Sequence, residues 1–509
     1  MLALLCFLPL AGALLLLCLP RASDARLRLV ALGVTLVAAG LGLALFLGFD
    51  GETPGFQAEF VREWFALAGP DGTIPVRLHL GLDGVSLLLV ALTALLMPLV
   101  VLSSYGHVHA RVKEFLVWLL VMETGMLGVF LALDLVLFYF FWEVSLVPLY
   151  FLVGIWGGER RLYATIKFFL YTVAGSLVML VAVIALIWQL GSASVPDLFL
   201  HTAALEPTTQ AWIFASFALA FAIKVPLLPF HTWLADAHTE APTSGSVLLA
   251  GVLLKMGTYG LLRFGIQLFP AMALDAAPVF MAVGAFGIVY GALLAMAQDD
   301  LKRLIACSSV SHLGFVVLGL FALTGAGLRG AVLQMINHGL STGLLFLLVG
   351  MVYERTHTRA LERYGGLAAV MPVFALFFVF TVLASVGLPG LNGFVGEYLI
   401  LAGTFEVSPL WAALGVSGVV LGAVYLLTAT RRMLFGPVVH PENRKLADLG
   451  AREVGLMLPL VALMVWIGVQ PNVLLDKCAP TLERILERVE DARFDARLAR
   501  PAADGQELR

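Results

Sequence analysis

Charged side chains are scarce in this sequence of 509 residues: Asp, Glu, Lys and Arg make up 13% of it, whereas 61% is hydrophobic. Soluble domains carry roughly 25% charged residues, so this chain has too few to cover a surface that faces water. The uncharged runs 168–196, 276–298 and 330–353 are each long enough for one helix of about 20 residues, which crosses ~30 Å of hydrocarbon. The composition therefore predicts an integral membrane protein of the all-α class.

Cysteine is scarce as well, and the sequence holds no C-x-x-C motif among Cys6, Cys18, Cys307 and Cys478. This spacing argues against an iron–sulfur or zinc site. Neither a dinucleotide-binding fingerprint nor a phosphate-binding loop is present, so we expect no NADH or ATP site. The net charge of −3 gives no reason to expect a nucleic acid partner. We therefore expect no cofactor and no metal in this chain, and the lipid bilayer as its surroundings.

Hydropathy predicts about fourteen membrane helices, each near the length that spans a bilayer. The apolar start, Met1–Pro20, lacks a basic segment and a small-residue cleavage site, so we interpret it as the first helix and not as a signal peptide. Two predicted helices contain prolines, in KVPLLP at 224–229 and in GLPGLNG at 387–393. Because proline breaks the helical hydrogen bonding, each should divide into two halves. The predicted spans are 2–20, 28–48, 80–103, 113–133, 135–157, 165–190, 209–238, 243–268, 276–297, 303–322, 329–353, 372–404, 408–430 and 453–470.

The two broken helices occupy similar places in successive blocks of five helices. Such a pattern is typical of repeated units around a transport path, and an odd number of helices per unit makes the two units inverted. Leu482, Ile485, Leu486 and Val489 follow helical spacing, which indicates an amphipathic helix on a membrane or partner surface, with a frayed tail as the alternative and disorder from Asp495 onward. The predicted organisation is helices 1–3 with an acidic outer loop (1–112), a first five-helix repeat (113–268), a second (269–430), an inner loop with helix 14 (431–470) and the amphipathic tail (471–509).

Basic residues give the predicted orientation. With the N-terminus outside, the inner loops hold 18 Lys and Arg residues and the outer loops hold 3. Cytoplasmic loops carry the excess of these residues. We therefore expect both termini on the outer side of a bacterial inner membrane.

Six titratable residues fall near the middle of predicted helices, where a charge costs about 2.5–3.5 kcal/mol on insertion scales. They are Glu143, Lys224, Lys255, His312, His338 and Glu397. A carboxylate beside an ammonium can act as a charge switch, a buried lysine can load and unload protons, and histidines relay them near neutral pH. The set predicts a proton path, although a Glu–Lys pair can also be a structural fastener and a buried histidine a core residue.

Other polar residues leave their roles open. Glu123 is a buried acid that either tunes Glu143 or faces a partner subunit, while Arg263 and Asp134 are expected at the membrane surface. A further group follows the first broken helix, and we interpret it as a polar loop or a proton entrance in preference to a metal site. Its members are His231, Asp236, His238 and Glu240.

Four segments resemble one family closely: FWEVSLVPLYFLVGIWGG at 141–158, AIKVPLLPFHTWLADAH at 222–238, LKMGTYG at 254–260 and NGFVGE at 392–397. They are similar to the corresponding helices of the subunit M family of bacterial respiratory complex I, the NADH–quinone oxidoreductase. The resemblance covers nearly the whole chain. It implies two inverted five-helix units and an antiporter-like, proton-translocating subunit of the membrane arm, with neighbouring antiporter-like subunits as partners.

Carried over by position, the resemblance assigns the ion pair to Glu143 and Lys224, the central lysine to Lys255, relay positions to His312 and His338, and the terminal acid to Glu397. It implies that NAD, FMN, iron–sulfur clusters and quinone are bound by partner subunits, so that this chain is a non-redox subunit of an enzyme.

Three alternatives remain at the level of sequence. A sodium/proton antiporter subunit of the Mrp type shares the fold but prefers lysine at the position of Glu397. A membrane subunit of an energy-converting hydrogenase is harder to distinguish. The third is a stand-alone substrate transporter or a non-conducting scaffold, and an alanine scan of the six central residues without effect on ion movement would support the scaffold.

Overall fold

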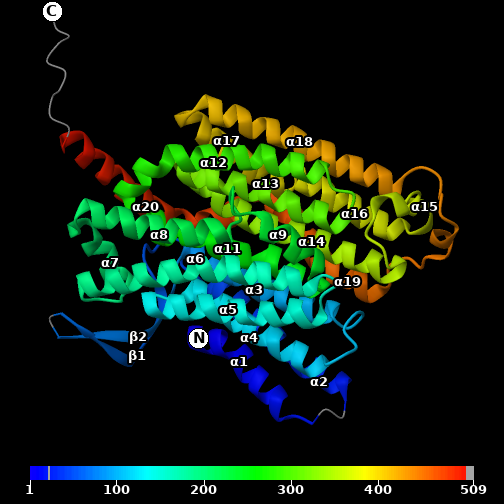
Figure 1. Cartoon of the computed structure of the whole chain (residues 1–509), viewed down its shortest axis with the longest axis horizontal. Coiled ribbons are helices and arrows are strands. Elements are labelled where there is room, and N and C mark those ends of the chain that lie inside the picture. Colours follow the sequence, from blue (N-terminus) through cyan, green and yellow to red (C-terminus); the bar gives the residue numbers. More distant parts are fainter. Residues whose placement is uncertain (21–22, 71, 500–509) are drawn as a thin grey trace, which may run out of the picture.

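The computed structural model describes residues 1–20, 23–70 and 72–499 as a bundle of long helices that run side by side (Figure 1). In this part of the chain, eleven helices are long and apolar enough to cross a membrane, which confirms a largely helical membrane protein. They are α2 (Asp24–Gly48), α3 (Gly84–Ser103), α4 (Val112–Leu131), α5 (Leu135–Trp156), α6 (Arg161–Leu190), the segment Thr243–Ile266, α12 (Pro270–Met296), α13 (Leu301–Phe321), α14 (Gly325–Thr356), α18 (Pro409–Leu434) and α19 (Ala451–Val469).

Several of these helices begin at an aspartate. The side chain of Asp83 accepts a hydrogen bond from the backbone N–H of Ser86, and Asp300 accepts one from that of Arg303. Such caps satisfy donors that the first helical turn leaves free. Hydropathy therefore locates the membrane helices, and local capping sets where they start.

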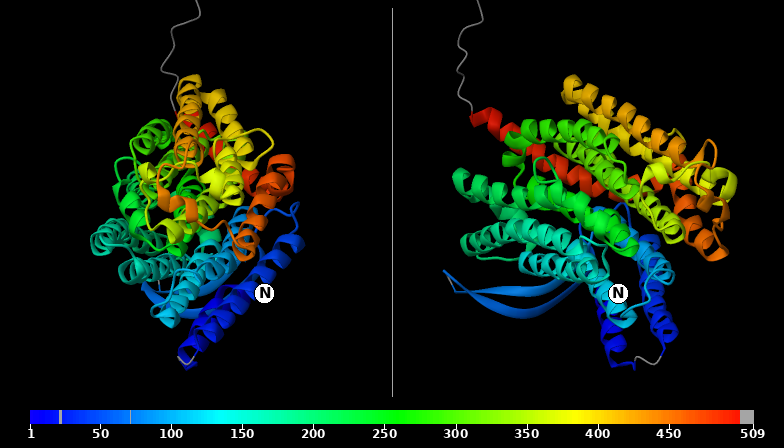
Figure 2. Two further views of the ribbon diagram at one scale, coloured as in Figure 1. Left: turned by 90° about the vertical axis from the view of Figure 1, so that its right-hand side faces the viewer. Right: turned by 45° about the vertical axis from the view of Figure 1, so that its right-hand side comes forward.

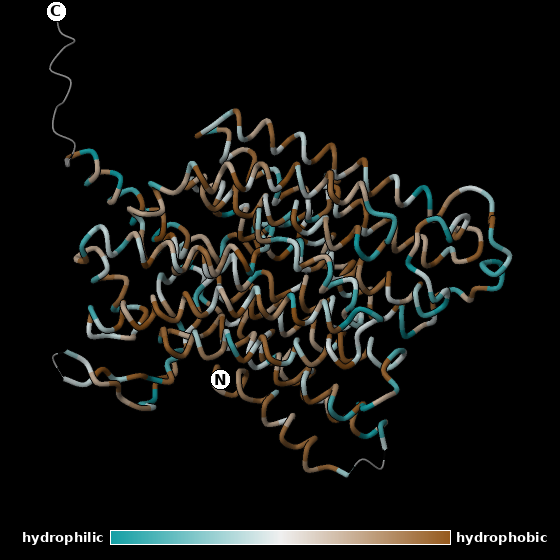
Figure 3. The backbone as a smooth tube through the Cα atoms, in the orientation of Figure 1, coloured by the Kyte–Doolittle hydropathy of each residue, from teal (hydrophilic) through white to brown (hydrophobic). Residues whose placement is uncertain are grey.

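Burial divides the bundle into a centre and a periphery. The segment Thr243–Ile266, α13 and α14 are buried along their whole membrane windows, whereas α2 and α18 are buried over only 28% of theirs. The peripheral helices are apolar, while hydrophilic residues gather at the loops and at points within the bundle (Figure 3). Polar groups on the central helices are therefore enclosed by protein and not by lipid.

Two helical paths are interrupted where the prolines predict. The helix α8 (Pro207–Lys224) ends before Val225, and α9 (Thr232–Glu240) resumes the path. The helix α16 (Pro372–Ser385) is likewise followed by α17 (Asn392–Val407). Each break leaves helix ends inside the protein, where the unpaired backbone groups can meet polar side chains.

The segment Thr243–Ile266 is irregular in a way that the sequence did not predict. Two π-helical turns, Leu249–Leu253 and Leu261–Ile266, flank α11 (Leu254–Gly260), and α10 (Thr243–Leu248) precedes them. Such turns occur often at functional sites because they shift the backbone hydrogen bonds by one residue. Lys255 lies in the short α-helical stretch between them.

A β-hairpin takes the place of the predicted acidic loop. Strand β1 (Gln57–Gly69) pairs antiparallel with β2 (Gly72–Leu82), and the hairpin extends away from the helices (Figures 1 and 2). The predicted helix start at residue 80 falls within β2, which continues to Leu82, and α3 begins four residues later, at Gly84. The apolar residues before Asp83 were assigned to the helix, although they belong to strand β2.

The C-terminal segment forms one long helix, α20 (Asn472–Ala499), which crosses the bundle (Figure 1). Its residues Leu482, Ile485 and Val489 are buried. They pack against α3, α12 and α14 of the same chain, which confirms the amphipathic helix and excludes a frayed tail over this range. The expected disorder from Asp495 was wrong up to Ala499, and the remainder lies outside the described residues.

The remaining helices are short or peripheral. They are α1 (Leu2–Cys18), α7 (Val195–His201) and α15 (Leu367–Val370).

Candidate functional site

Lys255 lies at the centre of the bundle and is fully buried. Its Nζ donates a hydrogen bond to the carbonyl of Ala250 in the first π-helical turn. It also lies 2.6 Å from Nδ1 of His338 on α14. No ion pair to a carboxylate is recorded for Lys255 in the described structure. The described contacts of Nζ are thus a backbone carbonyl and an imidazole, and an imidazole can take up and release protons.

His312 connects this pair to a carboxylate. His312 on α13 has its ring centroid 5.6 Å from that of His338. Its Nδ1 lies 3.3 Å from Oε1 of Glu397 on α17. Lys255, His338, His312 and Glu397 thus form one series of neighbouring titratable groups, which we call the central series. All four members lie in helices that are interrupted or enclosed by other helices.

Side-chain amides surround the acid end of the central series. Gln334 Nε2 lies 3.2 Å from Oε1 of Glu397, and Asn337 Nδ2 lies 3.3 Å from Oε1 of Gln334. Asn337 also donates to the carbonyl of Asn392 at 2.7 Å, directly after the break in the helical path. The sequence analysis did not single out these amides. The spacing of Gln334 and Asn337, three residues apart in one helix, was the available signal.

Glu143 and Lys224 form a separate group around Trp142. Lys224 is the last residue of α8 and is buried, and its Nζ lies 5.2 Å from the centre of the Trp142 ring. It is within electrostatic reach of Glu143, but the described structure records no direct ion pair between them. One carboxylate oxygen of Glu143 is buried and lacks a hydrogen-bond partner there. The two charges are thus held near each other, with the aromatic ring as the direct contact of the ammonium.

A cavity of about 420 Å³, which we call the polar cavity, lies beside the ends of α5 and α14. Its lining includes Glu240, His357 and Lys302, and Nζ of Lys302 donates to the carbonyl of Ala241. His238, on α9, is fully buried and lies within electrostatic reach of both Lys302 and Lys255. Both of its ring nitrogens lack a partner among the described residues. This histidine is therefore near both Lys302, which lines the cavity, and Lys255.

The other polar residues near the first break are engaged in ordinary contacts. Asp236 pairs with Lys167 at 2.7 Å and with Arg303 at 3.5 Å, and Glu240 accepts from the backbone N–H of Arg160 at 2.9 Å. Over the described residues, no group of three or more His, Cys, Asp or Glu could hold a metal ion.

Arg263 was expected at the membrane surface, but it is buried. Its guanidinium pairs with the carboxylate of Asp83, donates to Gln267 at 2.8 Å and stacks near Tyr259. Burial works against the charge of Asp83, yet the adjacent guanidinium holds the pKa of this carboxyl below its ordinary value. This pair joins the start of α3 to the second π-helical turn.

Two further acids also differ from expectation. Asp134 is buried at the start of α5, not at a surface, and burial raises its pKa although the N–H groups of Arg77, Val136 and Leu137 donate to it. Glu123 is fully enclosed, so it cannot face a partner subunit. Its two oxygens have no hydrogen-bond partner in the described structure.

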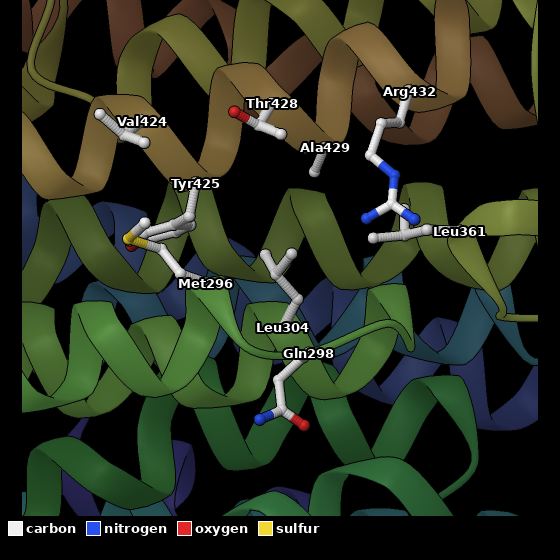
Figure 4. Close-up of a pocket in the computed structure, with 9 residues that line it drawn as sticks. All are labelled: Met296, Gln298, Leu304, Leu361, Val424, Tyr425, Thr428, Ala429 and Arg432. Carbon is white, nitrogen blue, oxygen red and sulfur yellow. The ribbon is translucent and has the colours of Figure 1, made fainter.

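A small cavity of about 70 Å³ lies where the loop after α12 meets α18 (Figure 4). Gln298, Thr428 and Tyr425 line it, and the buried Tyr425 is within electrostatic reach of Glu397. The cavity has room for a few water molecules, since one water needs about 10–15 Å³ by this measure.

Comparisons with known proteins agree with this architecture. A family model described as NADH:quinone oxidoreductase/Mrp antiporter, TM, matches residues 132–422. NADH-quinone oxidoreductase subunit M of Rhodobacter capsulatus is 44% identical over 96% of each chain. The protein of the same name from Pseudomonas aeruginosa is also 44% identical, over 86% of each chain.

Solved structures show the same likeness. A chain of respiratory complex I from Thermus thermophilus with bound NADH has a TM-score of 0.85 and 36% identity, over 96% of this chain and 100% of that one. A chain of the Mrp complex from Dietzia shares the fold, with a TM-score of 0.83 and 20% identity over 97% and 99% of the two chains. The chain therefore belongs to the NADH:quinone oxidoreductase/Mrp antiporter transmembrane family, in the branch of NADH-quinone oxidoreductase subunit M.

Proposed function

We propose that this chain is a proton-translocating, non-redox subunit in the membrane arm of an NADH–quinone oxidoreductase. The observation that carries the proposal is the central series, in which a buried lysine, two histidines and a glutamate lie in consecutive contact. Buried ionisable groups within a membrane are expensive and mark ion pathways. A scaffold would gain nothing from enclosing four of them in a row.

The contacts give an order of proton transfer. Lys255 passes its proton to Nδ1 of His338 over 2.6 Å. Transfer from His338 to His312 needs a ring rotation or a water, because the ring centroids are 5.6 Å apart. The 3.3 Å contact between His312 and Glu397 then delivers the proton to the carboxylate. Reloading of Lys255 proceeds from the polar cavity by way of Lys302 and His238.

Glu143 and Lys224 provide the control element in this proposal. A carboxylate near an ammonium stabilises the charge on both, and moving the two apart favours release of a proton from the lysine. Lys224 is the last residue of α8, at a break in the helical path, so a small movement of the end of α8 relative to α5 changes its distance from Glu143. In this proposal, the distance between Glu143 and Lys224 determines when the central series takes up a proton.

The proposal includes the arrangement of the whole chain. It has fourteen membrane helices, two inverted five-helix units at 113–268 and 269–430, and both termini on the outer face of a bacterial inner membrane. The partners are the neighbouring antiporter-like subunits, while NADH, FMN, iron–sulfur clusters and quinone are bound elsewhere in the complex. The exposed Val61, Trp64 and Phe65 on the hairpin offer an apolar contact surface to such a neighbour.

The test is NADH-driven acidification of inverted membrane vesicles at matched complex abundance. Lys255→Ala should reduce acidification and NADH oxidation together, because the central series loses its donor. Lys445→Ala removes an exposed lysine in the loop after α18 and is the matched control. If Lys255→Ala acidifies vesicles as the wild type does, the proposal is wrong.

The same vesicles distinguish protons from sodium. Acidification that a protonophore abolishes and that persists without sodium supports proton translocation. Acidification that requires sodium would instead favour an exchanger of the Mrp type.

A further inference from the structure

An apolar groove of about 440 Å³ lies beside the peripheral helix α2, and its lining also includes Ile336 and Leu340, two residues on either side of His338. It is bounded by α2, α3, α14, α19 and the start of α20. Its lining includes Gly40, Phe46, Leu92, Trp466 and Leu474. The mechanism proposed above uses none of these residues.

The groove has the length of one leaflet. Along α2 its lining runs from Ala39 to Leu47, which is roughly 12 Å at 1.5 Å per residue. Half of a hydrocarbon core of ~30 Å is about 15 Å. The groove therefore has room for hydrocarbon to about the depth of one leaflet.

A positively charged side chain lies at the end of this groove that is formed by α20. Lys477 on α20 has its Nζ 5.0 Å from the ring of Phe46, which lines the groove, and 5.9 Å from the ring of Phe49. The same atom donates to the carbonyl of Phe49 at 3.2 Å. An ammonium has three donors, so two remain for a ligand, with the exposed carboxylate of Asp50 nearby as a competitor.

A second cation follows two turns later. Arg484 lies near Gly55 in the same connecting segment, and its Nε is buried without a hydrogen-bond partner in the described structure. Lys477 and Arg484 are seven residues apart and so share one face of α20. An anionic group at this face would meet the two free donors of the Lys477 ammonium and lie near the positive charge of the Arg484 guanidinium.

We propose that this groove binds a glycerophospholipid, with one acyl chain between α2 and α19 and the phosphate held by Lys477 and Arg484. Apolar walls at hydrocarbon depth and cations at the surface end match the two halves of such a molecule. A second apolar groove, of about 380 Å³, lies between the hairpin, α5 and α6. The linings of both grooves lack lysine and arginine, so the second groove is a reference for labelling that depends on hydrocarbon alone.

The experiment uses the intact complex with phosphatidylglycerol that carries a diazirine in one acyl chain. After illumination, mass spectrometry of the peptides should find the label on α2, α3 and α19. The variant Gly40→Leu fills the groove, and a Cβ at Gly40 meets nothing within 4 Å, so the helix tolerates it. Gly33→Leu is the matched control, since Gly33 is equally open and lies two turns away outside the groove.

We expect Gly40→Leu to abolish labelling and Gly33→Leu to leave it unchanged. Lys477→Gln should lower labelling by phosphatidylglycerol about fivefold, the effect of removing one lysine from an anionic lipid. Labelling of the groove beside the hairpin should not change in Lys477→Gln.

Three results would overturn the proposal. One is equal labelling in Gly40→Leu and the wild type. Another is unchanged labelling in Lys477→Gln and in Lys477→Gln/Arg484→Gln, which would show that the groove holds an acyl chain but does not bind the headgroup. The third is an absence of labelling in the wild type together with a disulfide between Leu43→Cys and a neighbouring subunit, which would make the occupant a protein helix.

Discussion

Gly396→Ala should impair proton translocation through a single added methyl group. A Cβ at Gly396 would lie 2.4 Å from Oε1 of Gln334 and 2.8 Å from Nδ2 of Asn337. Both distances are far shorter than ordinary contact, so the two amides must move. The hydrogen bond of 3.2 Å from Gln334 to Glu397 is the contact at risk.

The size of the effect follows from that hydrogen bond. A hydrogen bond to a charged group contributes about 1.5–3 kcal/mol. Since 1.4 kcal/mol is a factor of ten, its loss changes the proton equilibrium between His312 and Glu397 by roughly 10- to 150-fold. Acidification of inverted vesicles at matched complex abundance should fall clearly, while the complex still assembles.

Two further variants separate this cause from general overpacking. Gly422→Ala adds the same methyl group to α18, where a Cβ meets nothing within 4 Å, and should leave acidification unchanged. Gln334→Leu removes the amide without crowding and should reproduce the defect, and the double variant with Gly396→Ala should be no worse than either, because both remove one interaction. Normal acidification in Gly396→Ala, or a defect there that Gln334→Leu lacks, would refute the reasoning.

Three other predictions follow from the contacts described above. Glu143→Ala should abolish most energy-coupled activity in an assembled complex, while Glu143→Asp retains part of it because a carboxylate remains; normal acidification in Glu143→Ala at matched abundance would rule out the switch. Asp83→Asn should lower the free energy of unfolding by about 3–5 kcal/mol by leaving Arg263 buried without its partner, and Arg263→Met in the same chain should recover part of it. Because the pKa of Asp83 is lowered, the stability from this pair should persist at neutral pH and be lost only on acidification through that lowered pKa, as melting temperatures against pH would show. Gly84→Ala should loosen α20, because a Cβ there would meet the carbonyl of Lys477 at 2.0 Å, and limited proteolysis should then cleave α20 faster than in Gly455→Ala, where the space is open.

The six titratable residues show which features of the candidate site could be predicted from the sequence. It identified all of them by their depth in apolar helices, because the cost of burying a charge makes each one conspicuous. It could not show that Lys255 contacts His338, 83 residues away, or that Glu143 and Lys224 lack a direct ion pair. Those facts depend on how each helix is rotated about its axis.

Residues with weak sequence signals were missed for the same reason. Gln334 and Asn337 look like ordinary polar residues of a long helix until α17 packs beside them. Arg263 was expected at the membrane surface because it lies near the end of a predicted span. In the structure it is buried and pairs with Asp83, 180 residues earlier in the chain. A buried ion pair between distant segments leaves no local pattern.

Hydropathy and proline act within a few residues, so the membrane environment, the approximate helix positions and both helix breaks can be predicted from the amino-acid sequence. The hairpin, the π-helical turns beside Lys255, the burial of α20 against its own chain and the order of the central series depend on contacts between distant segments. Apolar side chains favour insertion of a segment into the membrane. Which polar groups come into contact depends on packing among helices that are far apart in the sequence.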